Sequence, residues 1–277
     1  MNDDLTRSEL LLPGPAQALG ALLDVPVPDL ENEGLPLLWH WIYFLDRPAQ
    51  ADLGQDGHPV RGTVQAPPGP GARRMWAGGR VQTTGPLQCG QAATRHSRVL
   101  RVEDKLGRSG PLTFVTLGHQ ILQHGRVVID EQQDIVYRQA APPPRHPPVP
   151  ATDDPLVPAA DGEWAIEISP TLLFRFSALT YNAHRIHYDR DYARDAEGYP
   201  GLLTHGPLQA LAMAEAARAT GYGSQASLDF QYRLESPLFD YQGMIVKAVR
   251  GNEAVTTAVR DGYGRQTASG TLHSPGE

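Results

Sequence analysis

The residues best suited to chemistry lie in TYNAHRIHYD, residues 180–189, a polar run between two apolar segments. Within it, Asn182, His184 and His187 stand close together in the sequence. Histidine is the side chain whose unperturbed pKa lies nearest to neutral pH, so His187 is a candidate for proton transfer. Asn182 cannot take up a proton at that pH, and its amide can only orient water or bind a substrate through hydrogen bonds.

A metal site is the alternative explanation for two histidines that stand three residues apart. His184 and His187 could bind a metal ion if both lay on one face of a helix, but a structural site needs about four ligands. Tyrosines and Arg185 surround them, and no second cluster of Cys, His or Asp supplies the remaining ligands. We therefore expect no metal here, and we expect His184 to be a hydrogen-bonding scaffold residue.

The elements that must position these residues are two helices. Asp189 is suited to cap a short helix at 190–196. A longer helix is predicted over 206–221, because proline stands in its first turn, its interior is rich in alanine and a glycine ends it. If the chain doubles back, His187 and the amide of Gly206 face one cavity. That arrangement would combine a base with an oxyanion-binding helix dipole.

The chain divides at APPPRHPPVPATDDPLVP, residues 141–158, because proline at this density blocks helix and central strand alike. We place a first domain at 1–140, a linker at 141–162 and a second domain at 163–277. In the first domain, GLPLLWHWIYFLDR at 34–47 is apolar nearly all round, which predicts a buried helix.

Strand-like segments follow the helix in each half and are separated by short turn sequences. They lie at 79–84, 92–105, 112–122 and 126–138 in the first half, and at 227–238, 243–251, 253–261 and 265–274 in the second. One buried helix followed by an antiparallel meander, twice over, predicts an α+β fold in which each sheet wraps around its own helix. The two sheets can also pair edge to edge, which would protect their exposed edges.

The composition excludes several classes of function. The net charge of −7 argues against a nucleic-acid partner, because such proteins carry a basic surface. The sequence contains no stretch of about 20 apolar residues, so no membrane span is expected. The acidic N-terminus lacks the pattern of a signal peptide. The lone Cys89 stands among turn residues and is interpreted as a small, partly buried filler. A single thiol fits a reducing cytoplasm.

Two consecutive stretches carry a family resemblance: SALTYNAHRIHYDRDYA at 177–193 and GYPGLLTHGP at 198–207. They resemble the signature of MaoC-like (R)-specific enoyl-thioester hydratases. The form N-x-H-R-I-H-Y-D is most similar to the branch that contains type 2 3-hydroxyacyl-thioester dehydratases and mesaconyl-C4-CoA hydratases. WHWIYFL, DGHPVRG, RRMWAGGR, GRSGPLTFVT and DEQQDIVYR resemble the N-terminal region of that branch. The resemblance covers roughly residues 35–273.

This resemblance implies a double hot dog fold, a thioester substrate carried by coenzyme A or acyl carrier protein, and no metal or redox cofactor. His187 falls on the family's catalytic histidine, and Gly206 on the glycine whose backbone N–H binds the thioester carbonyl. Asn182 falls where many relatives carry the catalytic aspartate, so His187 is expected to carry the proton transfers alone. The first half lacks this pattern, so we expect it to shape the substrate tunnel without catalysing.

Further polar residues are candidates for substrate binding. Arg185 can pair with a charged group of the substrate, or it can brace the loop by pairing with a nearby aspartate. Arg73 and Arg74 can meet the phosphates of coenzyme A, or they form a solvated charged run beside a buried tryptophan. His184 lies in the same loop, and His205 can hold the entry of the helix that follows it.

These residues favour a lyase that interconverts 2-enoyl and 3-hydroxyacyl thioesters. A thioesterase is the first alternative, because the hot dog fold also supports hydrolysis and Asp189 offers a carboxylate. A non-catalytic acyl-CoA-binding protein is the second, if Asn182 marks lost chemistry. A double hot dog can stand alone or pair again into a homodimer.

Overall fold

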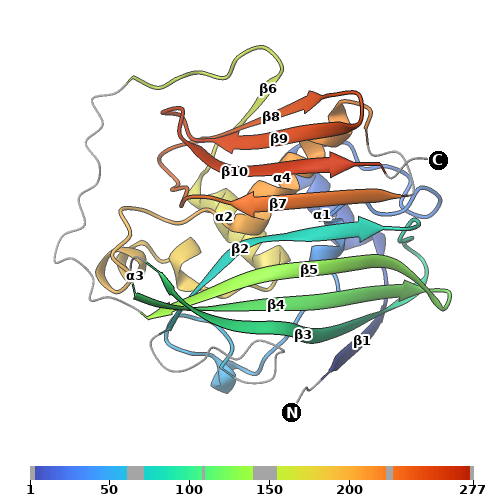
Figure 1. Ribbon diagram of the computed structural model, residues 1–277, viewed down its shortest axis with the longest axis horizontal. Helices are drawn as coiled ribbons and strands as arrows, with labels where there is room; N and C mark the ends of the chain where they lie inside the picture. The colour runs from blue at the N-terminus through green and yellow to red at the C-terminus, as the bar shows by residue number, and fades with distance from the viewer. Residues whose placement is uncertain (1–3, 61–71, 108–109, 140–154, 223–226, 275–277) are drawn as a thin grey trace.

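The computed structural model describes residues 4–60, 72–107, 110–139, 155–222 and 227–274. Their strands form one antiparallel sheet, and Figure 1 shows it as a continuous curved band with helices behind it. No helix among the described residues is long and apolar enough to cross a membrane. The elements in chain order are β1 (Leu5–Leu10), α1 (Pro13–Leu23), η1 (Trp39–Ile42), η2 (Gln50–Asp52), β2 (Ala72–Thr83), β3 (Ala92–Gly107), β4 (Gly110–Gln123), β5 (Arg126–Gln139), β6 (Glu163–Ile166), α2 (Pro170–Leu179), η3 (Arg185–His187), α3 (Arg190–Asp195), α4 (Gly206–Ala219), β7 (Leu228–Leu234), β8 (Met244–Arg250), β9 (Ala254–Arg260) and β10 (Gln266–His273).

The strands follow the spatial order β1-β3-β4-β5-β2-β7-β10-β9-β8-β6. Strands β1 to β5 come from the N-terminal half of the chain and β6 to β10 from the C-terminal half, so each half builds its own part of the sheet. The two parts join where β2 pairs antiparallel with β7. The α+β prediction and the edge-to-edge pairing of the two sheets are therefore confirmed, and all eight predicted strands are present.

Glycines make the junction between the two halves possible. A Cβ atom on Gly78 would lie 2.5 Å from the backbone oxygen of Tyr232 in β7, and one on Gly79 would lie 2.3 Å from the oxygen of Gln132 in β5. Both distances are shorter than any real Cβ contact, so only glycine lets three strands approach here. The segment RRMWAGG, which precedes the predicted strand, extends β2 toward its N-terminus.

The prediction of a helix over 34–47 is wrong. That segment forms only the single 3-10 turn η1, and it is flanked by Leu38 and Phe44, whose φ angles of 70° and 53° cannot belong to a helix. The prediction of burial is correct, because Leu38, Trp39 and Phe44 are at most 1% exposed. An apolar run without a polar face indicates burial but does not distinguish a helix from an irregular segment. The longest helix of the N-terminal half is instead α1, which packs against α2.

The helix predicted over 206–221 is confirmed as α4. It begins with Gly206 and Pro207, ends at Ala219 and packs against β8, β9 and β10. Gly221 follows with a φ of 76°, the left-handed conformation that often ends a helix. Figure 1 shows α4 behind the C-terminal part of the sheet, with α1 and α2 beside it.

The short helix predicted at 190–196 is α3. The Asp189 side chain accepts a hydrogen bond from the Tyr192 amide at 3.0 Å, so Asp189 is its N-cap as expected. Most of the predicted linker at 141–162 lies outside the described residues. Residues 155–162 contain no helix or strand, and the domain boundaries stay a prediction.

Candidate active site

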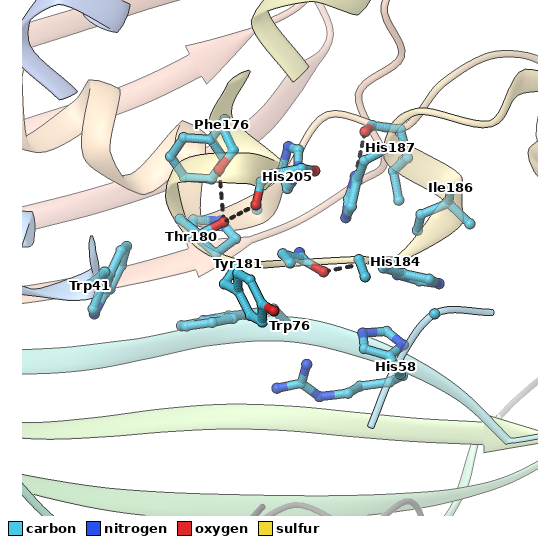
Figure 2. Close-up of a pocket in the computed structure, with 18 of the residues that line it drawn as sticks. Trp41, His58, Trp76, Phe176, Thr180, Tyr181, His184, Ile186, His187 and His205 are labelled. Atoms are coloured by element: carbon cyan, nitrogen blue, oxygen red, sulfur yellow. Dashed lines mark hydrogen bonds between the residues drawn. The ribbon is translucent and has the colours of Figure 1, made fainter. Parts of the chain in front are cut away.

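A cavity of about 940 Å³ is lined by residues from both halves of the chain. That volume is within the usual range for a small-molecule site. Trp41, His58 and Trp76 come from the N-terminal half, and they line the cavity together with His184 and His187 of the C-terminal half (Figure 2). The cavity therefore brings together segments that lie more than 100 residues apart in the sequence.

His187 has the geometry of a base. Its Nδ1 lies 2.7 Å from the backbone oxygen of Leu203. A carbonyl oxygen only accepts hydrogen bonds, so Nδ1 carries the hydrogen and Nε2 keeps its lone pair. Burial lowers the pKa of His187 to about 4, and the nearby His58 acts in the same direction. The ring projects from its bonded edge toward the segment that carries His184 (Figure 2), and it is neutral at neutral pH.

His205 connects His187 to the start of α4. The two rings stack with their centroids 3.6 Å apart and their planes 18° apart. On the other side, His205 Nε2 lies 2.8 Å from Ser177 Oγ, which anchors the ring to α2. His205 is also the residue that precedes Gly206 at the first position of α4. His187 and the N-terminus of α4 therefore share one wall of the cavity, as the sequence predicts.

Gly206 is suited to meet an oxyanion. The first amides of a helix have no intrahelical partners and lie at the positive end of its dipole. A Cβ atom at this position would lie 2.2 Å from Cδ1 of Leu234, so a larger residue here would force the tip of the Leu234 side chain to move. Gly206 and Leu234 both line the cavity.

Asn182 lines the cavity and braces the loop at the same time. Its Oδ1 accepts a hydrogen bond from the His184 backbone N–H at 3.0 Å. Because a donor holds the oxygen, the NH₂ group is the part of the amide that remains to donate to a ligand. Tyr181, just before it, has a φ of 52°, which shows how sharply the chain turns after α2.

The sequence interpretation missed Asp56 and His58. His58 Nδ1 lies 3.1 Å from Asp56 Oδ2, and the His58 ring packs on His184 with a centroid separation of 3.9 Å. Burial lowers the pKa of His58, so it too is neutral at neutral pH. In the sequence, the motif DGHP contributes only to the resemblance to the family branch. The spacing Asp-x-His in a turn was the signal that could have identified an oriented imidazole.

Asp56, His58 and His184 also form a group of three metal-capable side chains, with ligand atoms within 4.8 Å of one another. The expectation that the sequence around His184 lacks further ligands is therefore wrong, because folding brings them from the other half. The ring packing of His58 on His184 does not suit a shared ion. Imidazole lone pairs lie in the ring plane, and the planes here are tilted by only 40°.

The three candidate arginines occupy different places. Arg185 forms an ion pair with Asp189 at 2.7 Å, and its guanidinium stacks 4.0 Å from the Tyr192 ring centroid, which is the loop-bracing arrangement. Arg73 forms an ion pair with Glu197 at 2.6 Å. Arg185 and Arg73 are not among the residues that line the cavity. Arg74 does line it, and its positive charge adds to burial in lowering the pKa of His58.

A second polar group lies in the part of the cavity that the N-terminal half forms. Glu131 accepts hydrogen bonds from His40 Nε2 at 3.0 Å, from Trp41 Nε1 at 2.7 Å and from Gln133 Nε2 at 2.7 Å. Burial raises the pKa of Glu131, but His40 and the hydrogen bonds outweigh it and lower the pKa to about 2. The cavity wall thus contains a buried carboxylate that stays ionised.

A family model described as hydroxyacyl-thioester dehydratase type 2 matches residues 38–240 of the chain. The chain is also 48% identical over 230 residues to a mesaconyl-C(4)-CoA hydratase from Chloroflexus aurantiacus, covering 81% of this chain and 79% of that protein. The chain belongs to the type 2 hydroxyacyl-thioester dehydratase family. This family membership confirms the resemblance that the sequence motifs carry.

Solved structures show the same fold for this dehydratase. A MaoC-like dehydratase from Phytophthora capsici matches with a TM-score of 0.65 at 15% identity, covering 99% of this chain and 96% of that one. A Mycobacterium tuberculosis protein with a double hotdog fold matches with a TM-score of 0.53 at 13% identity, covering 98% and 94%. The double hot dog prediction is confirmed. The dehydratase is a hydro-lyase that interconverts 2-enoyl and 3-hydroxyacyl thioesters.

Proposed function

We propose that this dehydratase adds water to a short 2-enoyl-CoA whose acyl group carries a second carboxylate, and that it catalyses the reverse reaction. The observation that carries the proposal is a neutral, oriented His187 beside the N-terminus of α4, in a cavity that Arg74 also lines. The relative from C. aurantiacus is named for mesaconyl-C(4)-CoA, which is a substrate of this class.

The chemistry follows from the positions of His187 and Gly206. In hydration, His187 Nε2 takes a proton from water while the water oxygen bonds to the β-carbon. The double-bond electrons move to the thioester oxygen, and the Gly206 amide stabilises the enolate that forms. The imidazolium of His187 then gives its proton to the α-carbon. Each donor placed for such an oxyanion is worth about 3–4 kcal/mol, and positioned proton transfer adds about 10²–10⁴-fold.

Arg74 supports the choice of a carboxylated acyl group. In mesaconyl-C4-CoA the free carboxylate is attached to the carbon that receives the hydroxyl, so it must lie close to the reacting water. The charge of Arg74 is near enough to His58 and His184 to lower the pKa of both, after the larger effect of burial. A guanidinium binds carboxylates through paired hydrogen bonds. We therefore assign Arg74 to the acyl carboxylate instead of the phosphates of coenzyme A.

The N-terminal half is proposed to shape the acyl tunnel, and Asn182 to donate a hydrogen bond to substrate or water. The thioesterase alternative needs a carboxylate that activates water at the carbonyl. Asp189 does not provide one, because its carboxylate caps α3, pairs with Arg185 and does not line the cavity. The structure thus supports addition of water to the double bond over hydrolysis of the thioester.

The test is to incubate the purified protein with mesaconyl-C4-CoA and, separately, with crotonyl-CoA, which lacks the second carboxylate. Enoyl absorbance and free thiol are followed together. We expect the enoyl signal to fall without thiol release, and to fall faster with the carboxylated substrate. Thiol release would show hydrolysis, and binding without turnover would show an acyl-CoA-binding protein. The same acyl groups on acyl carrier protein identify the carrier.

A further inference from the structure

His58 is oriented in the way that enzymes orient a working imidazole. Its Nδ1 donates to Asp56 Oδ2, because a carboxylate only accepts, so the lone pair is on Nε2. The Asp56 Oδ1 atom accepts the His58 backbone N–H at 3.0 Å, which fixes the carboxylate itself. The His58 side chain is 15% exposed and lines the cavity. A carboxylate that holds one nitrogen of a histidine sets its tautomer and ring direction.

The turn that carries His58 is attached to the loop that carries His187. The Arg185 backbone N–H donates to the Asp56 oxygen at 2.8 Å, and the Arg185 side chain donates to the Gln55 oxygen at 3.1 Å. Gly57, at a φ of 87°, has no room for a side chain, because a Cβ atom would lie 1.8 Å from the Ala183 oxygen. The N-terminal half therefore presents His58 to the active site in a fixed position.

The active site also needs what His58 can supply. A water that attacks a double bond has two O–H groups, and His187 takes the proton from one of them. The Asn182 carbonyl oxygen already accepts the His184 backbone N–H, which leaves it one lone pair for a second donor. The His184 ring packs against both imidazoles, with its centroid 3.9 Å from that of His58 and 5.4 Å from that of His187, so His58 and His187 border the same part of the cavity.

We propose that His58, oriented by Asp56, is a second catalytic residue that holds the attacking water through Nε2. This inference rests on the proposed function and adds the group that fixes the nucleophile. In hydration, His58 Nε2 accepts a hydrogen bond from one O–H of the water and His187 Nε2 takes the proton of the other. The oxygen bonds to the β-carbon, the enolate electrons form, and His187 delivers its proton to the α-carbon. His58 stays neutral throughout, and the only atoms gained by the substrate are those of one water.

The experiment compares two substitutions that separate chemistry from packing. His58→Phe keeps an aromatic ring against His184 but removes Nε2. His58→Gln loses the ring but keeps an acceptor of similar reach. We expect kcat of hydration to fall about 100-fold in His58→Phe with little change in KM, because a misplaced reactant costs about that much. His58→Gln is expected to retain at least tenfold more kcat than His58→Phe. Gln55→Ala, an exposed side chain in the same turn, is the matched control.

The opposite order of the two variants, with His58→Phe more active than His58→Gln, would show that the ring only packs and would overturn the assignment. Equal, near-wild-type kcat in both variants would do the same. If a chelator abolishes wild-type activity and Zn²⁺ restores it, Asp56, His58 and His184 hold a metal, and the assignment also fails. Failure of the proposed function is a separate outcome, because wild-type protein would then hydrate neither enoyl-CoA. Circular dichroism on each variant establishes that the comparison is made between folded proteins.

Discussion

The two halves of the molecule use the same sheet architecture around very different interiors. Strands β7 to β10 are 7–8 residues long and wrap around α4, most of whose side chains are buried. Strands β2 to β5 are 12–16 residues long, and the predicted helix in front of them is reduced to the 3-10 turn η1. The N-terminal half instead contributes a wall of the cavity, which includes the buried Glu131 and its donors.

This difference shows how two halves with the same sheet architecture contribute different parts of the site. A helix packed against a sheet fills the interior and supplies a dipole, whereas a sheet without that helix leaves space for a ligand. In this dehydratase the proposed base, His187, and the helix N-terminus come from the filled half. Arg74 and the Asp56–His58 pair come from the open half. Catalysis and recognition are therefore expected to respond differently to substitutions in each half.

The largest effect is expected in the filled half, at His187. His187→Ala removes the only group proposed to move protons, so kcat should fall by about 10²–10⁴-fold while KM changes little. Initial rates of enoyl loss measure both constants. His96→Ala is the matched control, because it removes an exposed imidazole from β3 in the open half. If a folded His187→Ala protein kept most of its activity, another residue would have to be the base, and the proposed difference between the two halves would be wrong.

The next effect is expected at the start of α4. In Gly206→Ala the new methyl group crowds Cδ1 of Leu234, and we expect this crowding to move the amide of the first turn away from the thioester oxygen. Loss of one oxyanion donor costs about 10²–10³-fold in kcat. The double variant Gly206→Ala with Leu234→Ala makes room for the methyl group, and it should recover part of that loss. An unchanged kcat in the single variant would show that this amide does not touch the transition state.

A smaller effect, on binding instead of turnover, is expected in the open half. Arg74→Met removes a charged hydrogen-bond donor worth about 1.5–3 kcal/mol, so KM for mesaconyl-C4-CoA should rise by about 10–100-fold. KM for crotonyl-CoA should change little. Arg73→Met is the matched comparison, because Arg73 pairs with Glu197 away from the cavity. Equal rises with both substrates would instead indicate that the arginine binds the coenzyme.

The sequence predicts much of the C-terminal half and its site. The pattern of turns and apolar strands identifies β7 to β10, and proline, alanine and glycine identify α4. Cys89 is buried more deeply than expected, at 2% exposure. The proximity of His187 to Gly206 was expected on the condition that the chain doubles back, and the stacking of His187 on His205 meets that condition. These features depend on residues that are close together in the sequence, so the local sequence is enough to predict them.

The features that could not be predicted depend on contacts between distant segments. The meeting of His58 with His184 joins residues of the two halves, and nothing in the spacing within either half announces it. The two readings of Arg185 could not be separated from sequence alone, because its Asp189 and Gln55 partners depend on how the loop folds. The missing helix at 34–47 escaped for the opposite reason, since an all-apolar run looks the same whether its backbone is regular or not.

The smallest effect is expected from a change of pH within the neutral range. A more acidic pH should separate the titration of His187 from that of Glu131. The pKa of His187 is lowered from 6.5 to about 4, so the active neutral form persists and hydration should vary little between about pH 6 and 8. Its contribution to stability is complete above the unfolded pKa and is lost as the pH falls from 6.5 toward about 4.

Glu131 of the open half should respond at lower pH than the buried histidines, which include His58 of the same half. Glu131 has a pKa lowered from 4.5 to about 2, so its contribution is lost only as the pH falls through that window. The free energy of unfolding, measured with urea from pH 8 to pH 3, should therefore begin to decrease near pH 6.5. In Glu131→Gln the decrease should keep its onset near pH 6.5 and lose only its steepest part below pH 4.5. An onset that moves in Glu131→Gln would show that this carboxylate, and not the buried histidines, sets the acid sensitivity.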